Sequence, residues 1–320
     1  MKFLVIANLF TTLFLGAAQE ARPRLNSDQS KVANPDLIYV PDPGLRVDKA
    51  SNPAASVDKA GQVYLFFHDR SNPRPQKLVA TSRDGLRFTP ARQPTRQDSA
   101  NNPRRVQLPD GLWRSFHLGM NGEMTSKISP NGIDFMWESD IRYTAKPADN
   151  NRVGYYDIFT DPKGGVVLLY IGDMGGLNNV RRAYSTDDGW TFKFDRGSVL
   201  GDGNDGGRGH SHVDPKSFLL PSGRRRLLTM KQGPRPPHPP HRKVGHIYSF
   251  TTRDGNTFTP DAGIRIRPED FTQFNVYSLN DPVGVCLPDG RHRIYVCALI
   301  DEGGKGLRRA IVSATTRPRK

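Results

Sequence analysis

Residues 185–192 read Ser-Thr-Asp-Asp-Gly-Trp-Thr-Phe, and this order of a hydroxyl residue, an Asp-Gly pair and a following Phe decides the fold. Asp or Asn beside Gly favours the positive φ of a tight hairpin, the hydroxyl caps the turn, and Phe anchors it to a core. The pattern occurs four times, at residues 81–88, 128–135, 185–192 and 251–258. Their glycines lie 47, 57 and 66 residues apart. Four copies of one hairpin indicate a repeat architecture.

A second motif, a Gly turn followed by an apolar strand, precedes each hairpin and occurs a fifth time. Residues 215–223 and 282–290 are near duplicates of each other, and both end in a Pro-x-Gly turn. The apolar strands that follow the five turns lie at 63–67, 113–117, 166–171, 226–230 and 294–297. Each unit therefore consists of four antiparallel strands, which is typical of a propeller blade.

The fifth unit ends after its third strand at 307–313, and residues 37–40 are available to supply the missing outer strand. Closing the ring in this way removes an exposed sheet edge. We predict an all-β protein, a five-bladed β-propeller over residues 36–320 with four antiparallel strands per blade, preceded by an N-terminal extension at 19–35. A β-sandwich is the alternative.

The composition agrees with many short strands. The 320 residues include 31 Gly and 26 Pro, which leave few windows for a long amphipathic helix and exclude a helical bundle. Near the start of the chain, Lys2 is followed by an apolar run from Phe3 to Gly16 and the pair Ala17-Ala18, the pattern of a secretory signal peptide over 1–18. We expect a secreted or periplasmic protein; a core strand or an anchor helix is the alternative. No later stretch is long enough for a membrane helix.

The formal net charge of +14 indicates either a solvated basic surface or an anionic partner such as an acidic polysaccharide. No nucleic-acid-binding motif is recognisable, so nucleic acid is not an expected partner. Cys286 and Cys297 flank a turn at a spacing too wide for a disulfide, and we expect two buried free thiols; a disulfide, which export favours, is the alternative. A monomer without a cofactor is expected.

Residues 185–192 match every fixed position of the Asp-box of the sialidase superfamily (Ser-x-Asp-x-Gly-x-Thr-Phe/Trp). The other three copies resemble the looser hairpin of five-bladed propeller glycosidases, the arabinanase, xylosidase and invertase group. Asp214-Pro215 and Asp281-Pro282 resemble the Asp-Pro steps that open inner strands there. The resemblance spans roughly residues 36–316 and implies the fold, with the Asp-boxes away from the catalytic face.

The sequence also departs from both groups. It has no Arg-Ile-Pro segment near its start and only five repeats, whereas sialidases usually have six blades. Asn52-Pro53 lies where the arabinanase-like group carries a catalytic Asp, and Asn102-Pro103 also lacks a carboxylate. The resemblance therefore supports a carbohydrate-active fold without selecting one family.

Blade topology predicts where the chemistry lies. The loops entering the first strand and joining the second to the third lie at one end, and the Asp-Gly turns lie at the other. The first-strand starts supply Asn52, Asn102, Arg104, Arg105, Tyr155, Tyr156, Asp157, His210, His212, Asp214, Asn280 and Asp281. The second-strand ends supply His68, Asp69, Arg70, Asn121, Glu123, Asp173, Lys231, Gln232, Asp301 and Glu302. This convergence of polar side chains predicts a sugar-binding pocket.

Glycoside hydrolysis needs one protonated and one ionised carboxyl group. Asp157, Asp214 and Asp281, from successive blades, and Glu123 are the predicted catalytic residues. A turn cap at a strand entrance is the alternative for each Asp-Pro. The predicted substrate-binding residues are Arg104, Arg105, His210, His212, Asn52, Asp69, Tyr156, Asp173 and Asn280.

Several of these side chains have more than one interpretation. One of Arg104 and Arg105 could clamp a carboxylate or sulfate through bidentate hydrogen bonds. His210 and His212 lie on one side of an extended strand, where they could bind sugar hydroxyls or, with Asp214, a metal; we favour sugar and expect no metal. Tyr156 could stack on a sugar, act as a nucleophile or pack in the core.

The predicted function is that of an exported glycoside hydrolase with paired carboxylates, acting on a neutral or acidic glycan. A non-catalytic carbohydrate-binding propeller, favoured by the two Asn-Pro openings, is the first alternative. A propeller that serves as a scaffold for a protein partner is the second.

Overall fold

The structure is a computed structural model that describes Val32 and residues 34–119, 121–147, 153–172, 180–196, 199–200, 211–232 and 243–317. The predicted signal peptide at 1–18 and most of the extension at 19–35 lie outside these ranges. Within them, no helix is long and apolar enough to cross a membrane.

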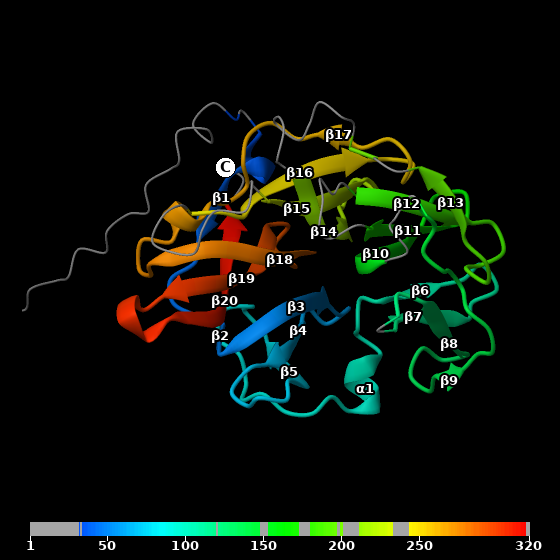
Figure 1. The fold of residues 1–320 in the computed structure, drawn as a ribbon, viewed down its shortest axis with the longest axis horizontal. Coiled ribbons are helices and arrows are strands. Elements are labelled where there is room, and N and C mark those ends of the chain that lie inside the picture. The colour runs from blue at the N-terminus through cyan, green and yellow to red at the C-terminus, as the bar shows by residue number, and fades with distance from the viewer. Residues whose placement is uncertain are drawn as a thin grey trace, which may run out of the picture.

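Five antiparallel sheets are arranged in a ring, so the predicted five-bladed propeller is confirmed (Figure 1). Blade 1 contains β3 (Ala50–Val57), β4 (Val63–Asp69) and β5 (Gln76–Ser82), and a single bridge from Val79 to Arg92 takes the place of an outer strand. Blade 2 contains β6 (Arg105–Gln107), β7 (Trp113–Leu118), β8 (Met124–Ser129) and β9 (Met136–Trp137). The short helix α1 (Arg96–Ser99) lies between these two blades along the chain.

The remaining blades complete the ring. Blade 3 contains β10 (Gly154–Thr160), β11 (Val166–Ile171), β12 (Val180–Ser185) and β13 (Lys193–Arg196). Blade 4 contains β14 (Ser211–Leu219), β15 (Arg225–Gln232), β16 (His246–Thr252) and β17 (Thr259–Pro260). Blade 5 contains β18 (Val276–Cys286), β19 (His292–Asp301) and β20 (Leu307–Thr316). Three 3-10 turns complete the described elements, at Pro35–Leu37, Pro268–Asp270 and Gly303–Lys305.

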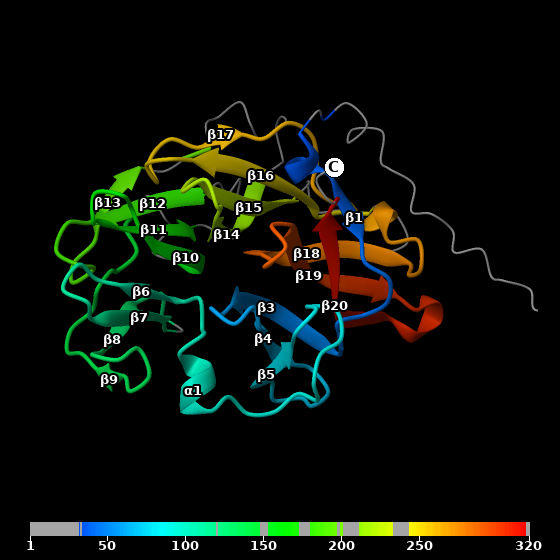
Figure 2. The ribbon, with the colours of Figure 1, turned by 180° about the vertical axis from the view of Figure 1, so that it is seen from behind.

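The N-terminal strand closes blade 5, as predicted from residues 37–40. Strand β1 (Tyr39–Pro41) pairs antiparallel with β20, with Tyr39 opposite Thr316, and β2 (Val47–Asp48) pairs further along the same strand. Figures 1 and 2 show β1 beside β20 from opposite sides. The Asp42 carboxylate, just after β1, accepts hydrogen bonds from the hydroxyls of Ser313 (2.6 Å) and Thr315 (2.9 Å). The ring is thus closed by backbone pairing and by side chains.

The four hairpins form the turns that their sequence requires. In the third copy, Gly189 has a φ of 79° and its N–H donates to Ser185 Oγ at 2.8 Å. The Asp187 carboxylate accepts the N–H of Thr191 at 2.9 Å. Because side chains within each hairpin stabilise its turn, each hairpin is a structural unit that follows the third strand of its blade.

Four buried clusters join neighbouring blades: blades 2 and 3, 3 and 4, 4 and 5, and 5 and 1. The fifth cluster contains only Ala54, Phe66 and Val79, with Tyr64 packed against it, and all four belong to blade 1. Among the described residues, therefore, blades 1 and 2 share no apolar core.

The two cysteines are free, as expected; Cys297 is buried, whereas Cys286 is only half-buried, in contrast to the prediction. Cys286 lies opposite His292, and Cys297 lies five positions further along β19. At the rise of a strand this separation is about 16 Å, too long for a disulfide.

Candidate functional site

The inner strands of three blades open with the same backbone irregularity. Asn52, Asp214 and Asp281 each precede a proline, sit at a positive φ of 53°, 55° and 52°, and lie at a register shift with the second strand. Asn and Asp tolerate this conformation better than other side-chain-bearing residues, and a bulge re-aims the side chain that it carries. All three side chains line pockets at the central channel. In blade 3 the bulge residue is Tyr155, which is 41% exposed.

Asp214, which is buried, and Asp281, which is half-buried, form a carboxyl pair. The backbone N–H of Asp281 donates to Asp214 Oδ2 at 3.2 Å. Burial, together with the neighbouring charge of Asp281, raises the pKa of Asp214 to about 7. Burial also raises the pKa of Asp281, although the ammonium of Lys216 and the N–H of Asn52 oppose this shift. The pair therefore retains a proton into the neutral range, and Asp281 has the cations that favour its ionised form.

Lys216 follows Asp214 by two residues and joins the carboxyl pair to the large pocket. Its ammonium donates to the carbonyl oxygen of Tyr156 and lies 5.2 Å from the centre of the Tyr156 ring. Burial and the nearby Arg104 guanidinium lower the pKa of Lys216 to about 8. The group is thus charged at neutral pH, close to Asp281.

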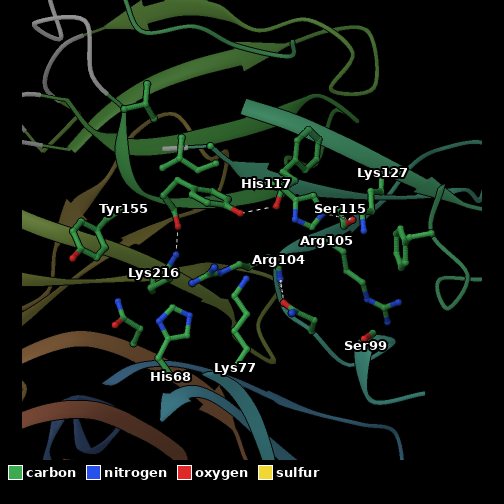
Figure 3. A pocket seen from close by; sticks show the side chains of 18 of the residues that line it. His68, Lys77, Ser99, Arg104, Arg105, Ser115, His117, Lys127, Tyr155 and Lys216 are labelled. Carbon is green, nitrogen blue, oxygen red and sulfur yellow. Dashed lines mark hydrogen bonds between the residues drawn. The ribbon is translucent and has the colours of Figure 1, made fainter. Parts of the chain in front are cut away.

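The large pocket has a volume of about 1390 Å³ and is lined by residues of blades 1, 2 and 3, with Lys216 and Asp281 from blades 4 and 5. His68 and Lys77 approach it from blade 1, and His117 and Lys127 approach it from blade 2, with Arg104 between them (Figure 3). The carboxylates among its lining residues are Asp134 and Asp281. The basic lining residues are His68, Lys77, Arg96, Arg104, Arg105, His117, Lys127 and Lys216.

The two histidines of this pocket are neutral at neutral pH. Burial lowers the pKa of His117 to about 4, and the positive charges of Lys127, Lys77 and Arg104 contribute to the shift. Burial and the charge of Lys77 lower the pKa of His68 in the same direction. Burial is thus the main cause of the suppressed protonation, and the excess of basic over acidic lining residues gives the pocket a positive electrostatic potential.

The structure brings together seven of the predicted site residues. Asn52, Arg104, Arg105, Tyr156 and Asp281 line the large pocket. Asp214 and Asn280 line an adjacent side pocket of about 290 Å³ that also contains Asn52 and Asp281.

Two of these seven residues are held by the fold itself. Arg105 stacks on Trp113 at 4.0 Å and donates to the Gly132 carbonyl. Tyr156 is buried, and its hydroxyl donates to the Phe116 carbonyl at 2.6 Å. Tyr156 therefore packs in the core at the pocket wall, the third of its predicted roles.

Other predicted residues lie apart from the pair. Asp157 lies two residues beyond the bulge residue of its strand and accepts the N–H of Ser217 at 2.9 Å. It lines a separate pocket of about 480 Å³. The carboxylate of Glu123 accepts a hydrogen bond from the Asn121 side-chain amide, and the carboxylate of Asp69 accepts the N–H of Ser71 at 3.0 Å. These carboxylates stabilise turns or strand starts.

His212 is 1% exposed, in contrast to its predicted contact with sugar. Its Nδ1 lies 2.9 Å from Thr229 Oγ, and its ring packs edge-on against Tyr248 and Phe250. The strand alternation that leads to the bulge at Asp214 turns this imidazole into the sheet interface. His210 and Asp173 lie outside the described residues. In the part of the chain that the structure describes, no group of three His, Cys, Asp or Glu side chains is placed to hold a metal.

Six basic residues of the pocket are absent from the predicted catalytic and substrate-binding residues: His68, Lys77, Arg96, His117, Lys127 and Lys216. Lys77 and Lys127 lie on third strands, which the topological rule does not consider. His68 lies at a second-strand end that the rule does consider, but the sequence gives no reason to prefer it to its neighbours.

Comparison with known proteins supports the fold. No family model and no curated relative matches the sequence. A solved structure described as a glycoside hydrolase matches with a TM-score of 0.59 at 13% identity, over 88% of this chain and 93% of its own. An endo-1,4-beta-xylanase from Bacteroides thetaiotaomicron matches with a TM-score of 0.57 at 12% identity, over 84% and 92%. An alpha-L-arabinofuranosidase from Podospora anserina matches with a TM-score of 0.54 at 12% identity, over 88% and 95%. The chain therefore shares the five-bladed propeller fold of glycoside hydrolases.

Proposed function

We propose that this protein hydrolyses glycosidic bonds, with Asp214 as the general acid and Asp281 as its ionised partner. The observation that carries the proposal is the pairing of buried Asp214 with half-buried Asp281 beside a pocket large enough for several sugar rings. A glycosidase needs one carboxyl group that keeps its proton near neutral pH and one that does not. The fold of the structural neighbours supports the same substrate class.

Asp214, Asp281 and Asn52 have different roles in the proposed reaction. Asp214, with a pKa of about 7, donates its proton to the leaving oxygen of the glycosidic bond. Asp281 remains ionised beside Lys216 and stabilises positive charge on the sugar ring or activates water. Asn52 contributes an amide to the same channel opening, where it is suited to a sugar hydroxyl.

A hydrolysis screen tests the proposal, with neutral and acidic aryl glycosides and polysaccharides as substrates. Asp214→Asn and Asp281→Asn should each reduce sugar release by about 10²- to 10⁴-fold. Asp157→Asn and Glu123→Gln are matched controls, because these carboxyl groups are bonded elsewhere, and both should stay within a few fold of the native protein. Equal loss in all four variants, or no loss in the first two, contradicts the assignment.

A carbohydrate-binding propeller without catalysis is the second candidate. It is favoured by Asn52 and Asn102, which open the first two inner strands without a carboxylate. Retained glycan binding without sugar release would select it. The polar, cationic pocket does not resemble the apolar-centred surface on which a protein-binding scaffold relies.

We also propose that the protein acts outside the cytoplasm, on the basis of residues 1–18. N-terminal sequencing of protein from the native source should begin at Gln19. An intact Met1 contradicts this proposal.

A further inference from the structure

The interface between blades 1 and 2 is built differently from the others. Arg293 of blade 5 donates to the Asp84 carbonyl in the hairpin of blade 1, and Arg114 of blade 2 donates to the Asp188 carbonyl in the hairpin of blade 3. In blade 1, the strand register places Tyr64 at the position that Arg293 occupies in blade 5 and Arg114 occupies in blade 2. The hairpin of blade 2 is instead bonded at Gly132 by Arg105 of its own blade.

The surface of blade 2 that faces this interface is polar. Ser115, Lys127 and Trp137 lie opposite one another across β7, β8 and β9, so their side chains emerge on one face. His117, two residues from Ser115, lies on the same face and bonds to its hydroxyl at 3.1 Å. Across the gap, His68 and Lys77 of blade 1 form a similar cross-strand pair. We call the space between these two faces the interblade cleft; it is the part of the large pocket lined by His68, Lys77, His117 and Lys127.

Positive charge in the cleft is not matched by carboxylates. Among the described residues, neither Lys77 nor Lys127 forms an ion pair. The Nε of Arg104, at the inner end of the cleft, is buried and has no hydrogen-bond partner. Asp134 is paired with Arg96 at 3.2 Å, which leaves Asp281 as the counter-charge at the floor. Cations that face one another in this way repel, and a bound anion would offset the repulsion.

The outer end of the cleft carries an exposed aromatic ring. Trp137 is 64% exposed, its ring lies 4.3 Å from Lys127 Nζ, and it is tilted by 56° against His117 at 5.1 Å. Both neighbours line the pocket. An indole held beside a cleft offers an apolar face for one side of a sugar ring.

We propose that the interblade cleft is a subsite for an acidic sugar, whose carboxylate or sulfate group is held by Lys77, Lys127 and Arg104 while Trp137 packs against the ring. The inference rests on the proposed function for its substrate class. The large pocket extends from His117 and Lys127, which contact Trp137, to Asp281, so one charged ring would lie near the cations and the bond to be cleaved would lie at Asp281. The carboxyl pair at the inner end of the pocket is suited to cleavage of a glycosidic bond, and the observations favour a glycan over nucleic acid for this reason.

Binding measurements on the Asp214→Asn variant test the subsite without turnover. The probes are an oligogalacturonate, a sulfated galactan oligosaccharide, a neutral arabino-oligosaccharide of the same length and a single-stranded oligonucleotide. We expect one of the two acidic glycans to bind at least tenfold more tightly than the neutral one, and its identity distinguishes carboxylate from sulfate. Tighter binding of the oligonucleotide, or equal binding of acidic and neutral glycans, overturns the proposal.

Substitutions then test which cationic side chains bind the acidic group of the glycan. Lys77→Gln combined with Lys127→Gln should weaken binding of the acidic glycan at least tenfold and reduce its dependence on salt. Lys163→Gln, the same change in the exposed turn between β10 and β11, is the matched control and should have no effect. The acidic glycan should also change the tryptophan fluorescence of the parent, and Trp137→Phe should abolish that change. Equal weakening by Lys163→Gln, or a fluorescence change that survives Trp137→Phe, contradicts the subsite.

The two proposals can fail independently. If the native protein cleaves neutral glycans and the acidic preference is absent, the subsite is wrong and the glycosidase stands. If acidic glycan binds as expected and no sugar is released from any substrate, the subsite stands and the catalytic assignment is wrong.

Discussion

The backbone N–H of Asp281 donates to the carboxylate of Asp214 across the boundary between blades 4 and 5. Each residue is at the bulge of its own inner strand, at nearly the same positive φ. The bulge that orients the side chain of one blade thus supplies the N–H that holds the carboxyl group of the blade before it. The position of the carboxyl pair is therefore a direct result of the repeat.

The stability of the protein should depend on the protonation of Asp214. Its pKa is about 7 in the fold and 3.8 in the unfolded chain, so the folded state retains a proton that the unfolded state releases. The contribution of the protonated Asp214 carboxyl group to stability is complete below about pH 4 and is lost as the pH rises to about 7. Asp214→Asn should remove a penalty of about 2 to 4 kcal/mol at pH 8 and have little effect at pH 4.

Thermal melts of the native protein and this variant at both pH values measure the effect. Asn52 occupies the equivalent bulge, which indicates that Asn fits the backbone of this site. Asp110→Asn, in an exposed turn, is the control and should give the same difference at both pH values. A gain at pH 8 no larger than that of the control contradicts the burial of a charged Asp214.

The pH dependence of hydrolysis should reflect the ionisation of Asp214 and Asp281. Activity requires protonated Asp214 and should fall about tenfold per pH unit above about pH 7. Lys216 lowers the pKa of Asp281, so Lys216→Gln should move the acidic limb of the profile to higher pH. Initial rates between pH 4 and 9, over the range in which the protein remains folded, measure both limbs. An acidic limb unmoved by Lys216→Gln argues against Asp281 as the ionised partner.

Binding of an acidic glycan should strengthen as the pH falls. His117 faces Lys127, Lys77 and Arg104, with Ser115 and Trp137 beside it, and His68 faces Lys77, Arg104 and Arg70. Burial and these positive charges keep both pKa values low, and an anion among the charges would raise both. Calorimetry at pH 5 and 8 should show tighter binding and net proton uptake at the lower pH. His117→Gln should halve the uptake, and the same uptake in that variant would contradict the linkage.

Arg293 should be important for the closure of the ring. Its side chain is 2% exposed; it bonds to the Asp84 carbonyl and the Thr315 hydroxyl, and Nε lies 3.3 Å from Asp42. Arg293→Met leaves the Asp42 carboxylate without its cation and should cost about 3 to 5 kcal/mol of unfolding free energy. Urea denaturation measures the loss. Arg291→Met, which breaks the exposed pair with Asp289, should cost less than about 1 kcal/mol.

The repeat made most of the fold predictable. The Asp-Gly hairpins and the Pro-x-Gly turns gave the number of blades, and the incomplete fifth unit indicated the strand that closes it. Asn52, Asp214 and Asp281 converge because the same Asx-Pro step forms the bulge in the inner strands of blades 1, 4 and 5. Such signals are local, and a local signal can be recognised in one sequence.

The interblade cleft could not be predicted in the same way. It depends on Tyr64 lying where blades 2 and 5 carry an arginine that reaches the next hairpin, and on the orientation of Lys77 and Lys127 toward one another. Asp157 illustrates the same limit, because its distance from the carboxyl pair depends on whether the bulge falls at residue 155 or at residue 157. Whether the faces of two neighbouring blades pack together depends on tertiary contacts between the blades, and no hairpin motif encodes these contacts.

The pairing of β1 with β20 has a consequence for how the molecule is made. Synthesis releases β1 first and its partner last, so the early strand must wait, unpaired, until nearly the whole chain has emerged. Blades 1 to 4 can assemble from neighbouring segments, whereas the last sheet requires contact between distant parts of the chain, which is slow to form. A protein interrupted before Leu307 would therefore keep two unpaired strand edges, and such a product is prone to aggregation.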